Sequence, residues 1–137
     1  MPSLPLKTLK IPTQRRCQMI DLTLQIRGLL SDVKGQDGMV IVYVPHTTAG
    51  ITINENADPD VQSDWLEKLG QLIPHREVYY RHGEGNSDSH LKASLVGSSV
   101  TVLLERGQLI LGRWQGIYFC EFDGPRQRDL LVKLTTF

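Results

Sequence analysis

Hydrophobic residues along this chain recur with the spacing of strands in most stretches. Short runs rich in β-branched and aromatic residues, bounded by glycine or proline, predict strands. Such runs lie at residues 6–11, 17–22, 39–44, 50–54, 100–104, 108–111, 117–122 and 128–135. The run at 39–44 is unbroken, which is typical of a central strand with both faces covered.

Three other stretches have the apolar spacing of helices. They lie at residues 23–35, 58–69 and 86–97. Asp58 is a suitable N-cap for the second helix, and Asn86 or Ser87 for the third. In the third helix we expect Leu91 and Leu95 to face the core. Helices placed early and strands gathered late predict an α+β fold rather than alternating βαβ units.

Length and composition predict one folded domain over residues 1–137. The chain has 40% apolar and 22% charged residues, as ordinary soluble proteins do. A chain of this size buries about two-thirds of the surface of its unfolded state, enough for a core without disulfides or structural metal. Cys17 and Cys120 match no paired zinc spacing, and we expect two thiols in or near the core.

The charge balance excludes a protein-wide electrostatic field. Fifteen basic and fifteen acidic residues give zero net charge, and no basic stripe with interleaved aromatics is present. We therefore expect no nucleic-acid partner. The first twelve residues lack the apolar stretch of a secretory signal, and no later run approaches membrane-spanning length. We expect a cytoplasmic protein without a membrane partner.

The first polar cluster leaves the end of the run at 39–44. Residues 45–58 contain His46, Thr47, Thr48, Glu55 and Asp58. Loops that leave a rigid scaffold often carry function, and so many polar side chains are hard to explain by packing. We assign functional roles to His46 and Glu55. The hydroxyls of Thr47 and Thr48 suit either an anion or local backbone bonds, and Asp58 suits a helix cap.

The second cluster, residues 81–90, combines histidines and carboxylates with two glycines. His82 and His90 are too far apart in sequence for one helical turn. A shared metal would therefore take one ligand from a loop and one from a helix, with His46 as a third. Imidazoles with a carboxylate suit zinc, whereas Glu84 and Asp88 with water suit magnesium. Solvent exposure of each histidine is the alternative.

The third cluster, residues 112–128, contains two arginines near a glycine-proline turn. Guanidinium groups bind phosphate or carboxylate in a bidentate manner, so Arg126 and Arg128 are candidates for an anion site. The alternative is a surface pairing of these arginines with Glu121 or Asp123, which contributes little stability. The sequence does not decide between the two.

Together the three clusters resemble the YjbQ-like family of uncharacterised proteins. The matching segments are PHTTAGITINENADPDV at 45–61, HGEGNSDSHLKASLVGSSVTV at 82–102 and LGRWQGIYFCEFDGPRQR at 111–128. The resemblance implies a β-sandwich-like core within the α+β fold and assembly as a homotrimer. It also implies a polar cavity to which five side chains contribute: His46, Glu55, Glu84, Asp88 and His90.

The resemblance further implies a thiamine-phosphate synthase-like activity, weak or secondary, acting on small phosphorylated molecules. On this hypothesis the catalytic residues are His46, Glu55, Glu84 and His90. The anion-binding residues are Thr47, Thr48, Arg126 and Arg128. A divalent metal, Mg²⁺ or Zn²⁺, would have the ligands His46, His82, Asp88 and His90. The alternative hypothesis is a non-catalytic module that binds a metal or a small anion.

Overall fold

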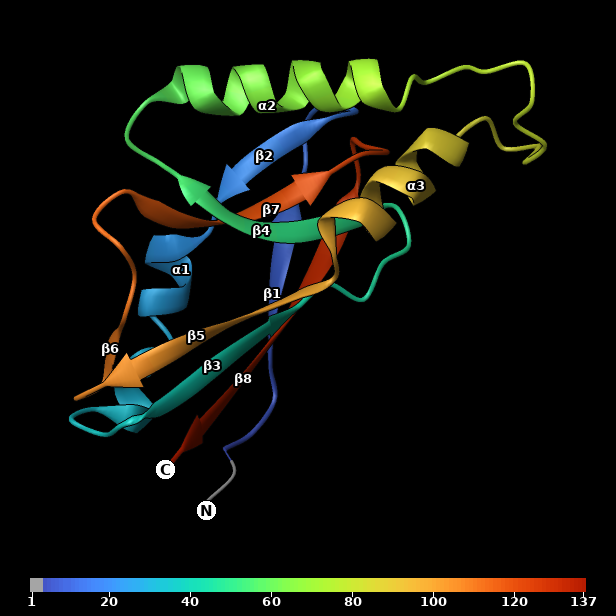
Figure 1. Cartoon of the computed structure of the whole chain (residues 1–137). Helices are drawn as coiled ribbons and strands as arrows, with labels where there is room; N and C mark the ends of the chain where they lie inside the picture. The colour runs from blue at the N-terminus through green and yellow to red at the C-terminus, as the bar shows by residue number, and fades with distance from the viewer. Residues whose placement is uncertain (1–3) are drawn as a thin grey trace.

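The computed structural model describes residues 4–137, which form three layers (Figure 1). A five-stranded sheet is one outer layer, a three-stranded sheet lies in the middle, and two helices cover the far face of the smaller sheet. One hydrophobic cluster fills the space between the sheets, and a smaller one lies between the three-stranded sheet and the helices. The predicted α+β fold with a sandwich-like core and about three helices is confirmed. Residues 1–3, part of the segment in which we expect no signal, lie outside the described residues.

The larger sheet has the order β1-β8-β3-β5-β6, and all neighbours are antiparallel. Its strands are β1 (Lys7–Pro12), β3 (Gly38–Tyr43), β5 (Ser99–Glu105), β6 (Gln108–Leu109) and β8 (Gln127–Thr136). Along β8 buried and half-buried residues alternate, with Val132 and Leu134 pointing into the core. This alternation is expected of a strand with one face on a core.

The smaller sheet has the order β2-β7-β4. Its strands are β2 (Gln18–Asp21), β4 (Ala49–Glu55) and β7 (Gln115–Glu121). Ile117 and Phe119 of β7 enter the cluster between the sheets, whereas Tyr118 and Cys120 enter the cluster under the helices. Both faces of β7 are therefore covered. Both cysteines are thiols, as predicted, with Cys17 half-buried.

The prediction that residues 39–44 form a strand covered on both faces is only half right. β3 does lie between β8 and β5, and Val40 and Val42 are completely buried. The opposite face carries Tyr43 and, on β5, Leu103, which are 44% and 58% exposed. Within residues 4–137 no element packs over this face (Figure 1). The unbroken apolar run therefore reflects β propensity as well as burial.

Helix α2 (Pro59–Leu72) begins as the sequence predicts. Asp58 is the N-cap, and its Oδ1 accepts a hydrogen bond from the Asp60 backbone N–H at 2.9 Å. Trp65 of this helix stacks on Phe122, with ring centroids 6.3 Å apart. No helix in residues 4–137 has the length and apolarity needed to cross a bilayer.

Helix α3 (Ser87–Val96) turns a different face to the core from the one predicted. Leu91 and Leu95 are 49% and 64% exposed. The buried residues are Asp88, Ser89, Lys92 and Ala93. The prediction was wrong because apolar spacing does not show that an aspartate and a lysine one turn apart are paired inside the protein.

The first predicted helix is divided into two short pieces. Helix α1 (Thr23–Arg27) is followed by a 3₁₀ turn, η1 (Leu30–Val33). Gly28, a poor helix former, lies between them. Ile26 and Val33 are nevertheless completely buried in the cluster between the sheets. The apolar spacing thus identified the buried residues but not the break in the backbone.

Candidate functional site

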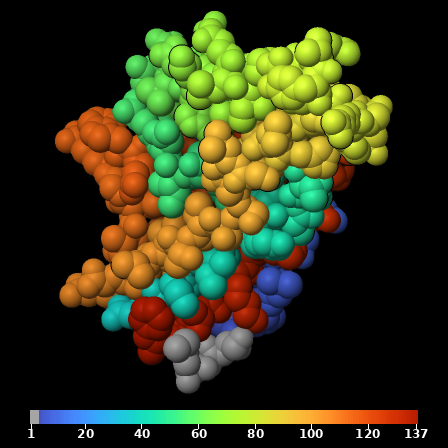
Figure 2. All heavy atoms as spheres, turned by 45° about the vertical axis from the view of Figure 1, so that its right-hand side comes forward, coloured from blue at the N-terminus to red at the C-terminus, as the bar shows by residue number. Residues whose placement is uncertain are grey.

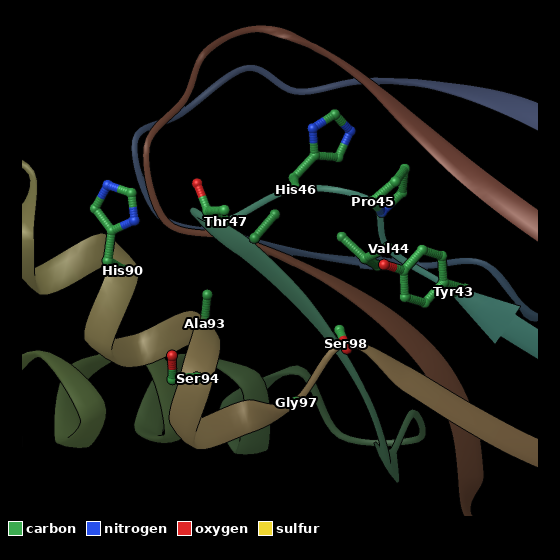
Figure 3. Close-up of a pocket in the computed structure, with 11 residues that line it drawn as sticks. Tyr43, Val44, Pro45, His46, Thr47, His90, Ala93, Ser94, Gly97 and Ser98 are labelled. Carbon is green, nitrogen blue, oxygen red and sulfur yellow. The ribbon is translucent and has the colours of Figure 1, made fainter.

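Two adjoining cavities open where the β3–β4 loop, α3 and the β7–β8 hairpin meet. One has a volume of about 590 Å³ and the other about 340 Å³. His46, Thr47 and His90 line both, so we treat them as one polar cavity. Figure 3 shows His46 and His90 on either side of Thr47. The hairpin side of the polar cavity adds Thr48, Glu84, Asn86, Asp123, Arg126 and Arg128.

Two glycines bring α3 close to the start of β4. A Cβ atom at Gly50 would lie 2.8 Å from the carbonyl oxygen of Gly97, so only glycine fits there. That carbonyl accepts a hydrogen bond from the backbone N–H of Ile51 at 3.0 Å. Gly97 itself ends α3 with φ +103°, a backbone conformation that residues other than glycine rarely adopt. The close approach sets the distance between the two walls of the polar cavity.

A backbone hydrogen bond fixes the chemical form of His46. The Asp129 N–H donates to Nε2 of His46 at 2.9 Å. A ring nitrogen that accepts carries no proton, so the neutral imidazole has its proton on Nδ1. Burial, and then the positive charge of Arg128, lower the pKa of His46. His46 therefore offers an Nδ1–H donor near neutral pH.

His90 lies in the first turns of α3 and belongs to a chain of polar contacts. Its ring meets the ring of His82 edge-on, with centroids 5.2 Å apart. Nε2 of His82 is 3.8 Å from a carboxylate oxygen of Glu84. Glu84 and His90 both line the polar cavity. Three of the predicted site residues therefore lie in succession at the start of α3.

Arg126 enters the polar cavity from the β7–β8 hairpin, partly in water. Its Nη2 donates to Oδ2 of Asp123 at 3.0 Å, and its side chain is 52% exposed. The same carboxylate oxygen accepts from Nδ2 of Asn86 at 2.7 Å. Asn86 Oδ1 is buried and has no hydrogen-bond partner within residues 4–137. Asn86 thus occupies the N-cap position of α3, as predicted, but its side chain bonds to the hairpin.

Arg128 is buried and paired with a carboxylate. Its guanidinium bonds both carboxylate oxygens of Glu121, and the two side chains are 3% and 0% exposed. The guanidinium also donates to Oγ1 of Thr48 at 2.8 Å, and Thr13 donates to Glu121. Of the two interpretations of Arg128, pairing is therefore the one observed, but the pair is buried rather than on the surface. Thr48 and Arg128 support the wall of the polar cavity.

Asp88 also has protein partners for both carboxylate oxygens. Arg16 donates two hydrogen bonds to it, at 2.9 and 3.0 Å, and Lys92 donates one at 3.2 Å. Burial alone would raise the pKa of Asp88, but these bonds and charges outweigh it and lower the pKa. Asp88 lines neither part of the polar cavity.

Glu55 lies far from the polar cavity within one chain. It pairs with Gln115 at the end of β4, whereas Ala49, next to the polar cavity, pairs with Glu121 at the other end. Glu55 is six positions along the strand from Ala49, a distance of about 20 Å. The structure therefore brings His46, Glu84 and His90 to one cavity and leaves Glu55 outside it.

The four side chains predicted as metal ligands do not form one coordination set. The lone pair of His46 Nε2 and both oxygens of Asp88 are already engaged. In the part of the chain that the structure describes, no three His, Cys, Asp or Glu side chains are arranged to hold a metal ion.

Sequence reasoning missed several residues of the site. Arg16 and Lys92 hold Asp88 in place, and Ser94 and Ser98 line the polar cavity. The i to i+4 spacing of Asp88 and Lys92 is a signal for their pairing. No signal in the sequence pointed to Arg16, which is 72 residues from its partner.

The architecture defines a class of protein: an α+β domain with a polar cavity at one end of a two-sheet sandwich. A crystal structure of an uncharacterised conserved protein of the YjbQ/UPF0047 family from Clostridium acetobutylicum has a TM-score of 0.91 and 50% identity, and covers 94% of this chain and 99% of that one. The hypothetical protein APE1520 from Aeropyrum pernix has a TM-score of 0.90 and 34% identity, covering 98% and 100%.

Sequence comparison identifies the family. The family model described as UPF0047 protein YjbQ-like matches residues 7–136. The UPF0047 protein YugU of Bacillus subtilis is 52% identical over 129 residues, which is 94% of this chain and 98% of YugU. The chain therefore belongs to the YjbQ-like family, UPF0047, as the sequence segments indicated.

Proposed function

We propose that the polar cavity binds a small phosphorylated molecule. The observation that carries this proposal is the hydrogen bond from the Asp129 N–H to His46, which makes the ring an Nδ1–H donor. Arg126 adds a partly exposed guanidinium to the same cavity. Such donors suit phosphate oxygens, because charge-assisted hydrogen bonds are among the strongest in proteins.

Within this function we propose a weak or secondary thiamine-phosphate synthase-like activity. In that reaction the C–O bond between a pyrimidine methylene and pyrophosphate breaks, and the thiazole nitrogen of thiazole phosphate bonds to the methylene carbon. Pyrophosphate leaves with the bonding electrons, so the main requirement is neutralisation of its charge. His46 and Arg126 are the side chains of this cavity that would meet the leaving group.

The test compares two arginine variants. Pyrophosphate binding is measured by calorimetry for the wild type, Arg126→Ala and the control Arg113→Ala. Arg113 is exposed and lies against Trp114, away from the polar cavity. We expect Arg126→Ala to weaken binding about tenfold or more and the control to leave it unchanged. Equal binding by all three proteins would overturn the proposal.

Turnover is tested with the same proteins. The pyrimidine pyrophosphate and thiazole phosphate are supplied together, and thiamine phosphate is measured. We expect slow product formation by the wild type and the control, and at least tenfold less by Arg126→Ala and His90→Ala. Product formed equally by the variants would identify a contaminating enzyme.

The second candidate function is a binding module without catalysis. It is favoured by the pairing of Arg126 with Asp123, because an arginine whose charge is already partly neutralised stabilises a departing pyrophosphate less. Ligand binding without product under all conditions would support it. A divalent ion is tested by adding Mg²⁺ or Zn²⁺ to the wild type and to His82→Ala, and a melting shift confined to the wild type would support metal binding.

We also propose that the chain assembles as a homotrimer, as the resemblance implies. Exposed leucines on two faces support contacts with other copies: Leu72, Leu95 and Leu103 are 63%, 64% and 58% exposed. Light scattering after size-exclusion chromatography gives the mass directly. A mass of one chain at micromolar concentration would overturn this proposal.

A further inference from the structure

A cavity distinct from the polar cavity opens between α2 and α3. It is lined by residues of both helices and by Thr52 of β4, and its volume is about 640 Å³, within the range of small-molecule sites. Figure 2 shows the two helices one above the other on the same face of the molecule, α2 in green and α3 in yellow to orange. We call it the helix-pair cavity. None of its lining residues lines the polar cavity, so a ligand here would occupy a separate site.

The walls of the helix-pair cavity are mainly apolar. Leu72 of α2 and Leu95 and Val96 of α3 line it beside Trp65. Leu72 and Leu95 are 63% and 64% exposed, so an apolar group that enters the cavity removes their surface from water, which favours binding. Trp65 is held by its stacking on Phe122. The cavity therefore fits a ligand with a compact apolar body.

Four lining residues carry polar side-chain groups that have no hydrogen bond or ion pair within residues 4–137. They are the hydroxyl of Thr52, the carboxylate of Asp64, the indole N–H of Trp65 and the ammonium group of Lys68. Asp64 and Lys68 are four residues apart on α2, a spacing at which opposite charges often pair, yet they do not pair with each other. One unpaired charge of each sign is therefore available to a ligand at this cavity.

The two charges favour a ligand that is itself zwitterionic. Asp64 repels a ligand that is only an anion, and Lys68 repels one that is only a cation. Neighbours at this helical spacing have Cβ atoms about 5–6 Å apart, so the adjacent ammonium and carboxylate groups of one α-amino acid can approach both side chains. Charge-assisted hydrogen bonds of this kind are among the strong ones in proteins.

We propose that the helix-pair cavity binds a free apolar α-amino acid such as leucine. The apolar side chain of the ligand lies between Leu72 and Leu95. Its ammonium group meets Asp64, and its carboxylate meets Lys68. The inference goes beyond the proposed function and does not depend on it, because the two sites share no residue and take ligands of different chemistry.

The test uses leucine and three ligands that each lack one of its parts. 4-Methylpentanoate lacks the ammonium group, 3-methylbutylamine lacks the carboxylate, and glycine lacks the apolar side chain. Affinities for the full chain are measured by NMR titration. We expect leucine to bind about tenfold more tightly than each of the three, because each lost part is a charge-assisted contact or a buried apolar group. Any of the three binding as tightly as leucine would overturn the proposal.

Charge variants locate the two charged groups of the ligand. Lys68→Gln should weaken leucine binding about tenfold and should not weaken binding of 3-methylbutylamine, which has no carboxylate. Asp64→Asn should likewise weaken leucine binding and spare 4-methylpentanoate. Glu67→Gln changes an exposed charge of α2 outside the cavity and is the matched control. All three residues are exposed, so the variants should fold, and melting temperatures verify this. An equal loss in the control, or leucine affinity unchanged in the other two variants, would overturn the site.

Two further measurements distinguish this site from the polar cavity and from an interface between copies. Leucine affinity should be the same with and without excess pyrophosphate, whereas competition between the two would place leucine in the polar cavity and overturn the inference. Leu72→Ala should weaken leucine binding several-fold without changing the molecular mass measured by light scattering. A lower mass with unchanged leucine affinity would show that a second copy occupies the cavity, which also overturns the inference.

Discussion

Two buried ion-pair clusters flank the polar cavity, and they differ in their access to water. In the first, Glu121 and Arg128 have side chains that are 0% and 3% exposed. In the second, Asp88 is 0% exposed and Lys92 is 5% exposed, but Arg16 is 31% exposed. The first cluster therefore has no member that can turn into solvent, whereas the second has an arginine that can.

The clusters also hold different parts of the site. Glu121 and Arg128 join β7 to β8 and bind Thr48, so they fix the β3–β4 loop that carries His46. Asp88 joins α3 to Arg16, which precedes β2, and so fixes the helix that carries His90. Each wall of the polar cavity is thus anchored by its own buried carboxylate. Replacing one carboxylate at a time tests whether the two anchors differ in strength.

The largest effect is expected for Glu121→Ala. Removing one partner of a buried pair leaves an uncompensated charge on Arg128, and the free energy of unfolding should fall by about 3–5 kcal/mol. Urea unfolding followed by circular dichroism measures this. Glu105→Ala, at an exposed end of β5, is the matched control. A loss below about 1 kcal/mol would contradict the role of the pair.

A double variant separates charge from packing. Glu121→Leu combined with Arg128→Met removes both charges, and replacement of a buried pair by apolar residues is often neutral. We expect it to recover most of the stability that Glu121→Ala loses. If the double variant is as unstable as the single one, shape rather than charge holds the loop.

A smaller effect is expected for Asp88→Asn. The amide keeps the shape and one acceptor but loses the charge that attracts Arg16 and Lys92, at a cost of about 1–3 kcal/mol. Because Arg16 is partly exposed, it can recover hydration, and the loss should be less than for Glu121→Ala. Urea unfolding measures the loss of free energy of unfolding in each variant. A larger loss for Asp88→Asn than for Glu121→Ala would contradict the expected difference between the two clusters.

The fold was predictable because the apolar residues recur at the spacing of the strands and helices that the structure contains. Ile117, Phe119, Val132 and Leu134 lie where the strand pattern places them, and Asp58 caps α2 as expected. The apolar spacing of α3 misled because its buried face is polar. Helical periodicity identifies a core only when the core-facing residues are apolar.

The sequence predicted which polar segments form the site but not which hydrogen-bond partners their side chains have. His46, His90 and Arg126 reach one cavity from three segments that the sequence singled out. Their roles depend on contacts distant in the chain, such as the Asp129 N–H bonded to His46, 83 residues away. For the same reason the burial of Arg128 was not recognisable, since nothing local shows that Glu121 is buried beside it.

Acid should weaken both clusters together. Burial would raise the pKa of Glu121, but hydrogen bonds from Arg128, Asp123 and Thr13 outweigh it and lower the pKa, as the partners of Asp88 do. A folded-state pKa below the unfolded value contributes stability that is present above about pH 4 and is lost as pH falls through the folded pKa.

The acid effect is measured as the free energy of unfolding at pH 5, 4 and 3. We expect a decrease below pH 4 that is smaller than the loss in Glu121→Ala, because the carboxylates protonate only gradually below their ordinary range. Asp88→Asn should show a shallower decrease, since one of the two groups no longer titrates. An equally steep decrease in that variant would show that other groups dominate.

The smallest effect is expected for Glu55→Gln, which tests a residue that the sequence placed in the site and the structure places outside it. Glu55 lies about six residues along β4 from the polar cavity, and its side chain is in neither buried cluster. Stability should change by less than about 0.5 kcal/mol, and pyrophosphate affinity should stay as in the wild type. A tenfold loss of affinity with unchanged stability would place Glu55 in the site of a neighbouring copy, because within one chain the strand holds it too far away. The site would then include a third carboxylate, contributed by the assembly rather than by the single chain.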